Sequence, residues 1–209
     1  PSRWLLQTIR LGYAIQFARR TPKFRGVHFT SVEAANAPVL LAKDAIQPAP
    51  PADMKVGFYS PYFIVPMKGS GLQPILDLRV LNRALYRLPF KMLTQKTHLQ
   101  VCPPQDWFAA TDLKDMYFHA SIFPCHRPFL RFTFEGRACQ HKVLPFGLSL
   151  SPRVSTEVTQ AALVPLREQG ICTLNYLDDW LNYLDDWLIL AQSQDQLCEH
   201  RDLVLAPQP

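Results

Sequence analysis

Residues 171–190 read ICTLNYLDDWLNYLDDWLIL and contain the same seven residues, NYLDDWL, twice in succession. The first copy spans 175–181 and the second spans 182–188. Apolar residues surround each Asp-Asp pair, a pattern that predicts two β-strands joined by a turn, because Asp is favoured in turns. A seven-residue repeat is too short for a solenoid unit, so we interpret it as a small duplication inside a single hairpin.

Only one copy of the repeat can occupy the turn of this hairpin. Side chains of a strand alternate between two faces, and seven is odd, so exchanging the copies reverses the face of each displaced residue. If the first copy forms the turn, the return strand is WLNYL (180–184), whereas the second copy leaves 188–190 in the return strand. We predict the first arrangement, with Asp178 and Asp179 in the turn and the second Asp pair displaced.

A third carboxylate, Asp112, follows the apolar residues 107–110, which predict a largely buried strand. A carboxylate at the end of a buried strand is costly unless it is paired or bound to a cation. Asp112 facing an Asp pair from a neighbouring turn would supply the oxygen ligands that Mg²⁺ prefers. Two such ions about 3.5–4 Å apart promote phosphoryl transfer. Taken alone, however, an Asp-Asp pair is better explained as an ordinary turn.

Composition limits the class of protein. The chain has 209 residues, of which 48% are hydrophobic and 19% charged, so it has enough apolar residues for a core and is not disordered overall. No apolar stretch approaches the ~18 residues of a membrane-spanning helix. The 5 cysteines are scattered, odd in number and without the paired spacing of a zinc site, which favours reduced thiols in an intracellular protein that is not secreted.

Charge is unevenly distributed, although the net charge is only +5. Residues 1–32 contain six basic and no acidic residues, and 68–100 contain six basic residues and one acid. After Tyr176 there are seven acids and one arginine. A basic amino-terminal half with an acidic carboxyl-terminal end suits a protein that binds phosphates at one place and divalent cations at another. Ordinary solvated surfaces explain the same distribution equally well.

Strands and helices are interleaved along the chain, which predicts a mixed α+β class. A helix is expected to begin at Ser151, a good N-cap residue, and to end at Gly170. A shorter helix is expected around 4–18, and the proline-rich residues 46–53 form an extended connector. Strands are expected at 62–65, 75–78, 107–113, 128–134, 137–144 and 171–174.

Four motifs occur in a characteristic order along the chain. They are YFIVPMKGSGLQPILDLRVLN (62–82), FAATDLKDMYF (108–118), LPFGLSLSP (144–152) and the YLDD hairpin. Together they resemble the reverse transcriptase domain of retroelements, most nearly the gypsy-like and DIRS-like retrotransposons of animal genomes. The resemblance runs from about residue 59 to residue 190 and implies a fingers–palm fold of the polymerase type without a thumb.

The resemblance also implies four consecutive segments. They are an N-terminal flank at 1–45, a fingers-like segment at 46–104, a palm with the catalytic Asp residues at 105–195 and a truncated C-terminal tail at 196–209.

By the same resemblance, Asp112, Asp178 and Asp179 look like the three catalytic metal ligands of the palm. The alternative copy supplies Asp185 and Asp186 instead. The metal implied is a pair of Mg²⁺ ions, with Mn²⁺ as the other candidate ion.

Further residues match the nucleotide-binding positions of the family. Tyr117 falls where these enzymes place an aromatic ring that excludes a 2′-hydroxyl by a steric clash, although simple core packing is the competing explanation. Asp115 lies near the same pocket and is expected to act through its backbone. Phe146 and Gly147 match the loop that contacts the nucleotide and the template.

Phosphate binding is expected to depend on basic residues. Lys68 lies at the tip of the fingers hairpin, where a cation meets the triphosphate. Gln73 occupies a position where the family usually has Arg, so a bidentate phosphate clamp is missing from the nucleotide-binding site. The residues expected to follow the nucleic-acid backbone are Arg79, Arg83, Arg87 and Lys91.

The resemblance implies an RNA-directed DNA polymerase that transfers deoxynucleoside triphosphates to a primer on an RNA or DNA template. It further implies a parent polyprotein with a ribonuclease H domain, a cytoplasmic or nuclear location and no membrane partner. The alternative is a catalytically inactive, degenerate retroelement fragment that at most binds nucleic acid, favoured by Gln73, the duplicated hairpin and the end of the chain at APQP. Another palm-type enzyme, such as a nucleotide cyclase, is disfavoured by the LPFG and DLRVLN segments.

Overall fold

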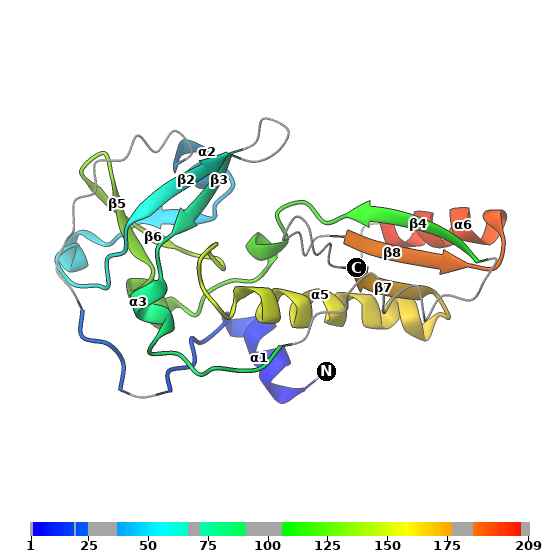
Figure 1. The fold of residues 1–209 in the computed structure, drawn as a ribbon, viewed down its shortest axis with the longest axis horizontal. Helices are drawn as coiled ribbons and strands as arrows, with labels where there is room; N and C mark the ends of the chain where they lie inside the picture. The colour runs from blue at the N-terminus through cyan, green and yellow to red at the C-terminus, as the bar shows by residue number, and fades with distance from the viewer. Residues whose placement is uncertain are drawn as a thin grey trace. The chain divides into compact units, whose positions relative to one another are not determined.

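A computed structural model of the chain describes residues 2–18, 20–24, 37–66, 72–90, 106–176 and 186–205 (Figure 1). Helices and strands are interleaved within these ranges, so the predicted mixed α+β class is confirmed. The chain divides into two compact units. Unit 1 contains Pro1–Leu88 and Tyr117–Ser155, and unit 2 contains Pro89–Met116 and Thr156–Pro209. The segment boundaries expected from the sequence stay predictions.

Unit 1 contains two small antiparallel sheets. The first has the order β1-β6-β5, and the second is the hairpin β2-β3. The strands are β1 (Ile46–Pro48), β2 (Tyr62–Pro66), β3 (Leu72–Leu76), β5 (Arg131–Phe134) and β6 (Arg137–His141). The helices and 3₁₀ turns are α1 (Arg3–Leu11), α2 (Ala37–Ala42), η1 (Pro51–Asp53), α3 (Arg79–Asn82), η2 (Met116–His119) and η3 (Pro124–Phe129).

The first helix is shorter than predicted. Ser2 caps α1 by accepting a hydrogen bond from the Leu5 amide, and Gly12 ends the helix with φ +92°. A Cβ at Gly12 would lie 2.7 Å from the backbone nitrogen of Phe123, so this position admits only glycine without a shift of the backbone. The structure therefore ends the helix at Leu11, where the sequence pattern alone extended it to residue 18.

The core of unit 1 includes a buried arginine. Alternation along β5 places Arg131 and Phe132 on opposite faces of the sheet, yet both side chains are buried. The Arg131 guanidinium donates to Gln140 Oε1 at 3.0 Å and to the backbone carbonyls of Asp53 and Val56. A buried cation is tolerated only when its donors find acceptors. Arg131 thus fixes the loop after η1 against β5 by satisfying carbonyls that no strand pairs with.

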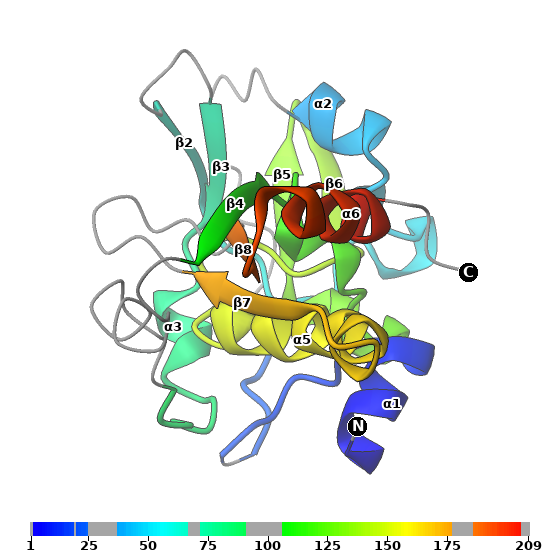
Figure 2. The same cartoon turned by 90° about the vertical axis from the view of Figure 1, so that its right-hand side faces the viewer.

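Unit 2 is a three-stranded antiparallel sheet with helices on one face. The strand order is β4-β8-β7, with β4 (Trp107–Asp112), β7 (Cys172–Tyr176) and β8 (Asp186–Ala191). Figure 2 shows α6 (Gln194–Leu205) beside β4 and β8, both of which it contacts. The long helix α5 (Ser151–Glu168) begins at the predicted Ser151. No element was predicted for the residues of α6.

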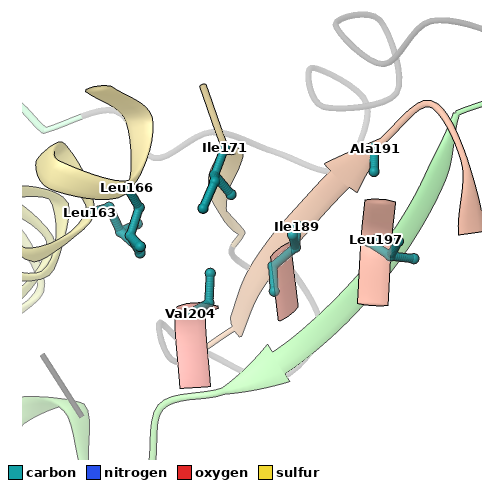
Figure 3. Packing of buried hydrophobic residues seen from close by; sticks show 7 residues of the cluster. All are labelled: Leu163, Leu166, Ile171, Ile189, Ala191, Leu197 and Val204. Carbon is teal, nitrogen blue, oxygen red and sulfur yellow. The ribbon is translucent and has the colours of Figure 1, made fainter. Parts of the chain in front are cut away.

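One apolar cluster holds the sheet and the helices of unit 2 together (Figure 3). Ile189, at the middle of β8, is completely buried, and Ala109 and Trp187 pack against the cluster from the sheet. The buried members are Leu163, Leu166, Ile171, Ile189, Ala191, Leu197 and Val204. They come from α5, β8, α6 and the residue that precedes β7, so the position of β8 determines how the whole unit packs.

The predicted return strand of the duplicated hairpin is wrong. β7 pairs with residues 186–190 of the second copy and its continuation, and not with 180–184. The physical reason is that the second copy continues into Ile189 and Ala191, whose apolar side chains are buried in the cluster. Asp178 and Asp179 lie outside the described residues.

Replacing Ile189 with Ala is expected to lower the free energy of unfolding by about 2–5 kcal/mol, because it leaves a cavity in a fully buried cluster. Leu205→Ala in α6 is the matched control, since Leu205 is 60% exposed and should change stability by about 0.5 kcal/mol or less. Urea unfolding of both variants measures the difference. Equal losses would show that β8 is not central to the core.

A second prediction concerns His141, which is fully buried with no hydrogen-bond partner for either ring nitrogen among the described residues. Burial lowers the pKa of His141 to about 3, against about 6.5 in the unfolded chain. The unfolded state therefore binds the proton first, and stability should fall as pH drops from about 6.5 towards 3.

The expected slope of that loss is at most about 1.4 kcal/mol per pH unit. His141→Leu removes the titrating ring and should flatten the dependence of unfolding free energy on pH between 6.5 and 4. The same slope in both proteins, measured by urea unfolding at each pH, would exclude His141 as its origin.

Candidate active site

The predicted catalytic strand ends lie side by side in unit 2. β8 is the central strand, and its first residue, Asp186, is paired with Asp112 of β4 on one side and with Tyr176 of β7 on the other. Asp112 is the last residue of β4, as the sequence predicted. The prediction that this strand is largely buried is wrong, because Trp107 and Phe108 are exposed and, among the described residues of β4, only Ala109 packs against the cluster of unit 2. Two carboxylate residues therefore occupy directly opposite positions on adjacent strands, at the end of the sheet where both β7 and β4 finish.

The remaining Asp residues of the hairpin, Asp178, Asp179 and Asp185, lie outside the described residues. Among the residues that the structure does describe, no group of three or more His, Cys, Asp or Glu is arranged to hold a metal ion. The donor type at Asp112 and Asp186 nevertheless fits a hard divalent cation, which takes carboxylate oxygens.

The aromatic residues predicted to contact the nucleotide come together in unit 1. Tyr117 in η2 and Phe146 are far apart in sequence, yet their ring centroids are 4.7 Å apart with a tilt of 49°. Both side chains are half-buried, so each ring keeps a surface that a ligand can reach. Asp115, two residues before Tyr117, has a left-handed backbone with φ +57°.

The loop that carries Phe146 and Gly147 is held by Asn82, a residue that sequence reasoning missed. The Asn82 Nδ2 donates to the Gly147 carbonyl at 2.8 Å, and the Ser149 amide donates to Asn82 Oδ1 at 3.0 Å. The Leu76 amide donates to the Phe146 carbonyl at 3.1 Å. Asn82 is the last residue of the DLRVLN motif. Its amide has both a donor and an acceptor, and this was the sequence signal that it could hold a loop.

Gly147 cannot be replaced without moving this loop. Its φ is +102°, and a Cβ at this position would lie 2.0 Å from the carbonyl oxygen of Leu76. The close approach brings the backbone of β3 against the loop and leaves no room for a side chain.

The family of the chain is shown by comparison with known proteins. A sequence profile described as "Reverse transcriptase (RNA-dependent DNA polymerase)" matches residues 65–206, more than half of the chain. The chain belongs to the reverse transcriptase family. The Gag-Pol polyprotein of Rous sarcoma virus subgroup C (strain Prague) is 33% identical over 133 residues, which cover 58% of this chain and 8% of that protein.

Other reverse transcriptase relatives agree. The intracisternal A-particle Pol-related polyprotein of mouse intracisternal a-particle MIA14 is 30% identical over 132 residues, covering 58% of this chain and 15% of that protein. The crystal structure of a prototype foamy virus protease–reverse transcriptase matches with a TM-score of 0.66 at 17% identity, covering 94% of this chain and 26% of that one. The chain thus spans less than a fifth of either polyprotein, and the foamy virus enzyme confirms the fold.

The basic residues assigned to nucleic-acid contact differ in their surroundings. Arg79 is exposed and forms a bidentate pair with Asp77, with bonds of 2.9 and 2.7 Å, and this lowers the pKa of the Asp77 carboxyl. Arg83 and Arg87 are exposed. Gln73 is half-buried in β3 opposite Val65. The other two predicted phosphate contacts, Lys68 and Lys91, lie outside the described residues.

Gly147→Ala is expected to destabilise the chain by about 1–3 kcal/mol more than Gly136→Ala. Both glycines have positive φ, but a Cβ at Gly136 meets nothing within 4 Å, so the control carries only the conformational cost. Urea unfolding of the two variants isolates the contact with Leu76. Equal destabilisation would show that the loop adapts to a side chain.

Proposed function

We propose that this chain is the fingers–palm part of an RNA-directed DNA polymerase, which adds deoxynucleoside triphosphates to a primer 3′-hydroxyl on an RNA or DNA template. The single observation that carries the proposal is the pairing of Asp112 with Asp186 at the strand ends of a chain in the reverse transcriptase family. Carboxylates at adjacent strand ends suit divalent cations that bind a triphosphate.

In this proposal the metal ligands are Asp112 and one of the two Asp pairs of the hairpin, with Mg²⁺ as the ion and Mn²⁺ as its substitute. Bound Mg²⁺ would polarise the phosphates and lower the pKa of the attacking hydroxyl. The half-buried pair of Tyr117 and Phe146 would contact the nucleotide, and Asn82 would keep the Phe146 loop in place.

The nucleic-acid contacts follow from charge and exposure. Arg83 and Arg87 are exposed and would bind phosphates of the template backbone. Arg79 has its guanidinium fork engaged with Asp77, so we expect a smaller contribution from it. Gln73 cannot form the bidentate phosphate contact of an arginine, so affinity for the triphosphate would depend more on Lys68 and the metal.

We also propose the setting of the chain. It belongs to an intracellular retroelement of the gypsy-like or DIRS-like kind from an animal genome, in a polyprotein that includes a ribonuclease H domain. The order of the four motifs supports the subtype, and the Gag-Pol relatives support the polyprotein. No helix within the described residues has the length and apolar character needed to cross a membrane.

A primer-extension assay with Mg²⁺ tests the proposed polymerase. Asp112→Asn should lower extension about 100-fold or more, since a lost metal ligand removes several kcal/mol of transition-state stabilisation. Asp195→Asn, in the first turn of α6, is the matched control and should extend like the unmodified chain. Extension that survives Asp112→Asn would contradict the assignment.

The competing function is an inactive retroelement fragment that binds nucleic acid. Nine residues separate the paired Tyr176 and Asp186, whereas a chain with one copy would have two. This longer connection favours the inactive alternative. Salt-sensitive binding of a primer–template, without extension in Mg²⁺ or Mn²⁺ by the unmodified chain or by a variant with one copy deleted, would establish this alternative.

A further inference from the structure

We propose that the second copy of the repeat supplies the catalytic strand end, so that Asp186 and not Asp179 is the ligand beside Asp112. The extra seven residues are then an insertion at the tip of the hairpin. This inference rests on the proposed function, which leaves the choice of copy open.

The strand register separates the two possibilities. Tyr176 pairs with Asp186, and Cys172 pairs with Leu190. If the first copy closed the hairpin with the same turn, every partner of β7 would move by seven residues. Tyr176 would then pair with Asp179, and Cys172 with Tyr183.

The apolar cluster of unit 2 selects the first of these registers. Ile189 is completely buried between the sheet and the helices, opposite Ala109 and Thr173. A shift of seven residues would place Asn182 at this position, and its amide would be surrounded by apolar side chains. The same shift would place Leu184 where Ala191 is buried, and the added volume would overpack the cluster.

The start of α6 provides a second, independent constraint. Only Gln192 and Ser193 separate β8 from α6, and the Gln196 amide donates to Ser193 Oγ at 3.2 Å as an N-terminal cap. Leu197 and Val204 anchor α6 in the cluster. In the shifted register the strand would end at residue 184, and the apolar stretch 187–190 would leave the core for the connection to α6.

With Asp186 as the ligand, the strand pairs of this chain are the same as those expected for a chain with a single NYLDDWL. Nine residues, 177–185, connect the paired Tyr176 and Asp186, which is seven more than the two of a single YLDD hairpin. Deleting either copy yields the same sequence, and all the pairs that β8 forms with β7 and β4 survive the deletion. The duplication therefore lengthens the connection between the strands. The pairs of β7 with β8, and the pair of Asp112 with Asp186, are unchanged.

Disulfide formation tests the register of β7 against β8 and does not require polymerase activity. Cys172 is an exposed free cysteine, and paired residues on antiparallel strands have Cβ atoms about 4.5–5.5 Å apart, close to disulfide geometry. In the Leu190→Cys variant, mild oxidation should join Cys172 to the introduced thiol as the major product, identified by peptide mass mapping. Tyr183→Cys is the matched control, and its introduced thiol should not cross-link to Cys172.

A disulfide between Cys172 and the thiol of the Tyr183→Cys variant, or no disulfide in the Leu190→Cys variant, would overturn the assigned register. The ligand itself is tested by titration with Mn²⁺ alone, where Asp186→Asn should weaken binding about tenfold or more relative to Asp179→Asn. An equal or larger effect of Asp179→Asn would refute the assignment of Asp186. If the disulfide and Mn²⁺ experiments give the expected results but primer extension fails, the result would count against the proposed function only.

Discussion

The position of β8 between β4 and β7 is the constraint on which unit 2 depends. A central antiparallel strand hydrogen-bonds on both sides, so its register fixes two sets of partners at once. In this chain the same register fixes which side chains enter the cluster with α5 and α6 and which residue is opposite Asp112. Packing and the candidate active site are therefore two consequences of one pairing.

Unit 1 shows a different way of holding functional residues in place. The loop at 146–149 is not itself part of a strand, and its backbone groups are paired with the Asn82 side chain and with the amide of Leu76, the last residue of β3. The buried Arg131 does the same for the carbonyls after η1. Side-chain amides and guanidinium groups satisfy several backbone groups at a time, and this allows a loop to be rigid without belonging to a sheet.

Much of this arrangement could be predicted from local sequence patterns. The apolar stretch before Asp112 predicted β4 and its end, because strand patterns depend on a few neighbouring residues. Ser151 predicted the start of α5, although its hydroxyl donates to the Pro145 carbonyl, whereas an N-cap side chain accepts a hydrogen bond from a backbone amide. The motif order predicted that Tyr117 and Phe146 serve one site, and their rings are in contact.

The choice between the copies could not be made in this way. Both contain the same seven residues, so every local preference is identical, and the difference arises from the residues on the carboxyl side of each copy. The deciding contacts are tertiary packing contacts, which place Ile189 in one cluster with residues of α5 and α6. The burial of Arg131 was missed for the same reason, since its carbonyl partners lie about 75 residues earlier in the chain.

The duplication costs less free energy as a longer connection than it would as a shifted strand register. Lengthening a connection from two residues to nine costs about 1.3 kcal/mol of loop-closure entropy, since the cost grows only with the logarithm of length. Moving the register by seven residues would bury the Asn182 amide without a partner, at about 1–3 kcal/mol. It would also remove Ile189 and Leu190 from the core, at about 1.5–3 kcal/mol each. The longer connection is therefore the less costly arrangement, and it is compatible with the pairs that β8 forms with β4 and β7.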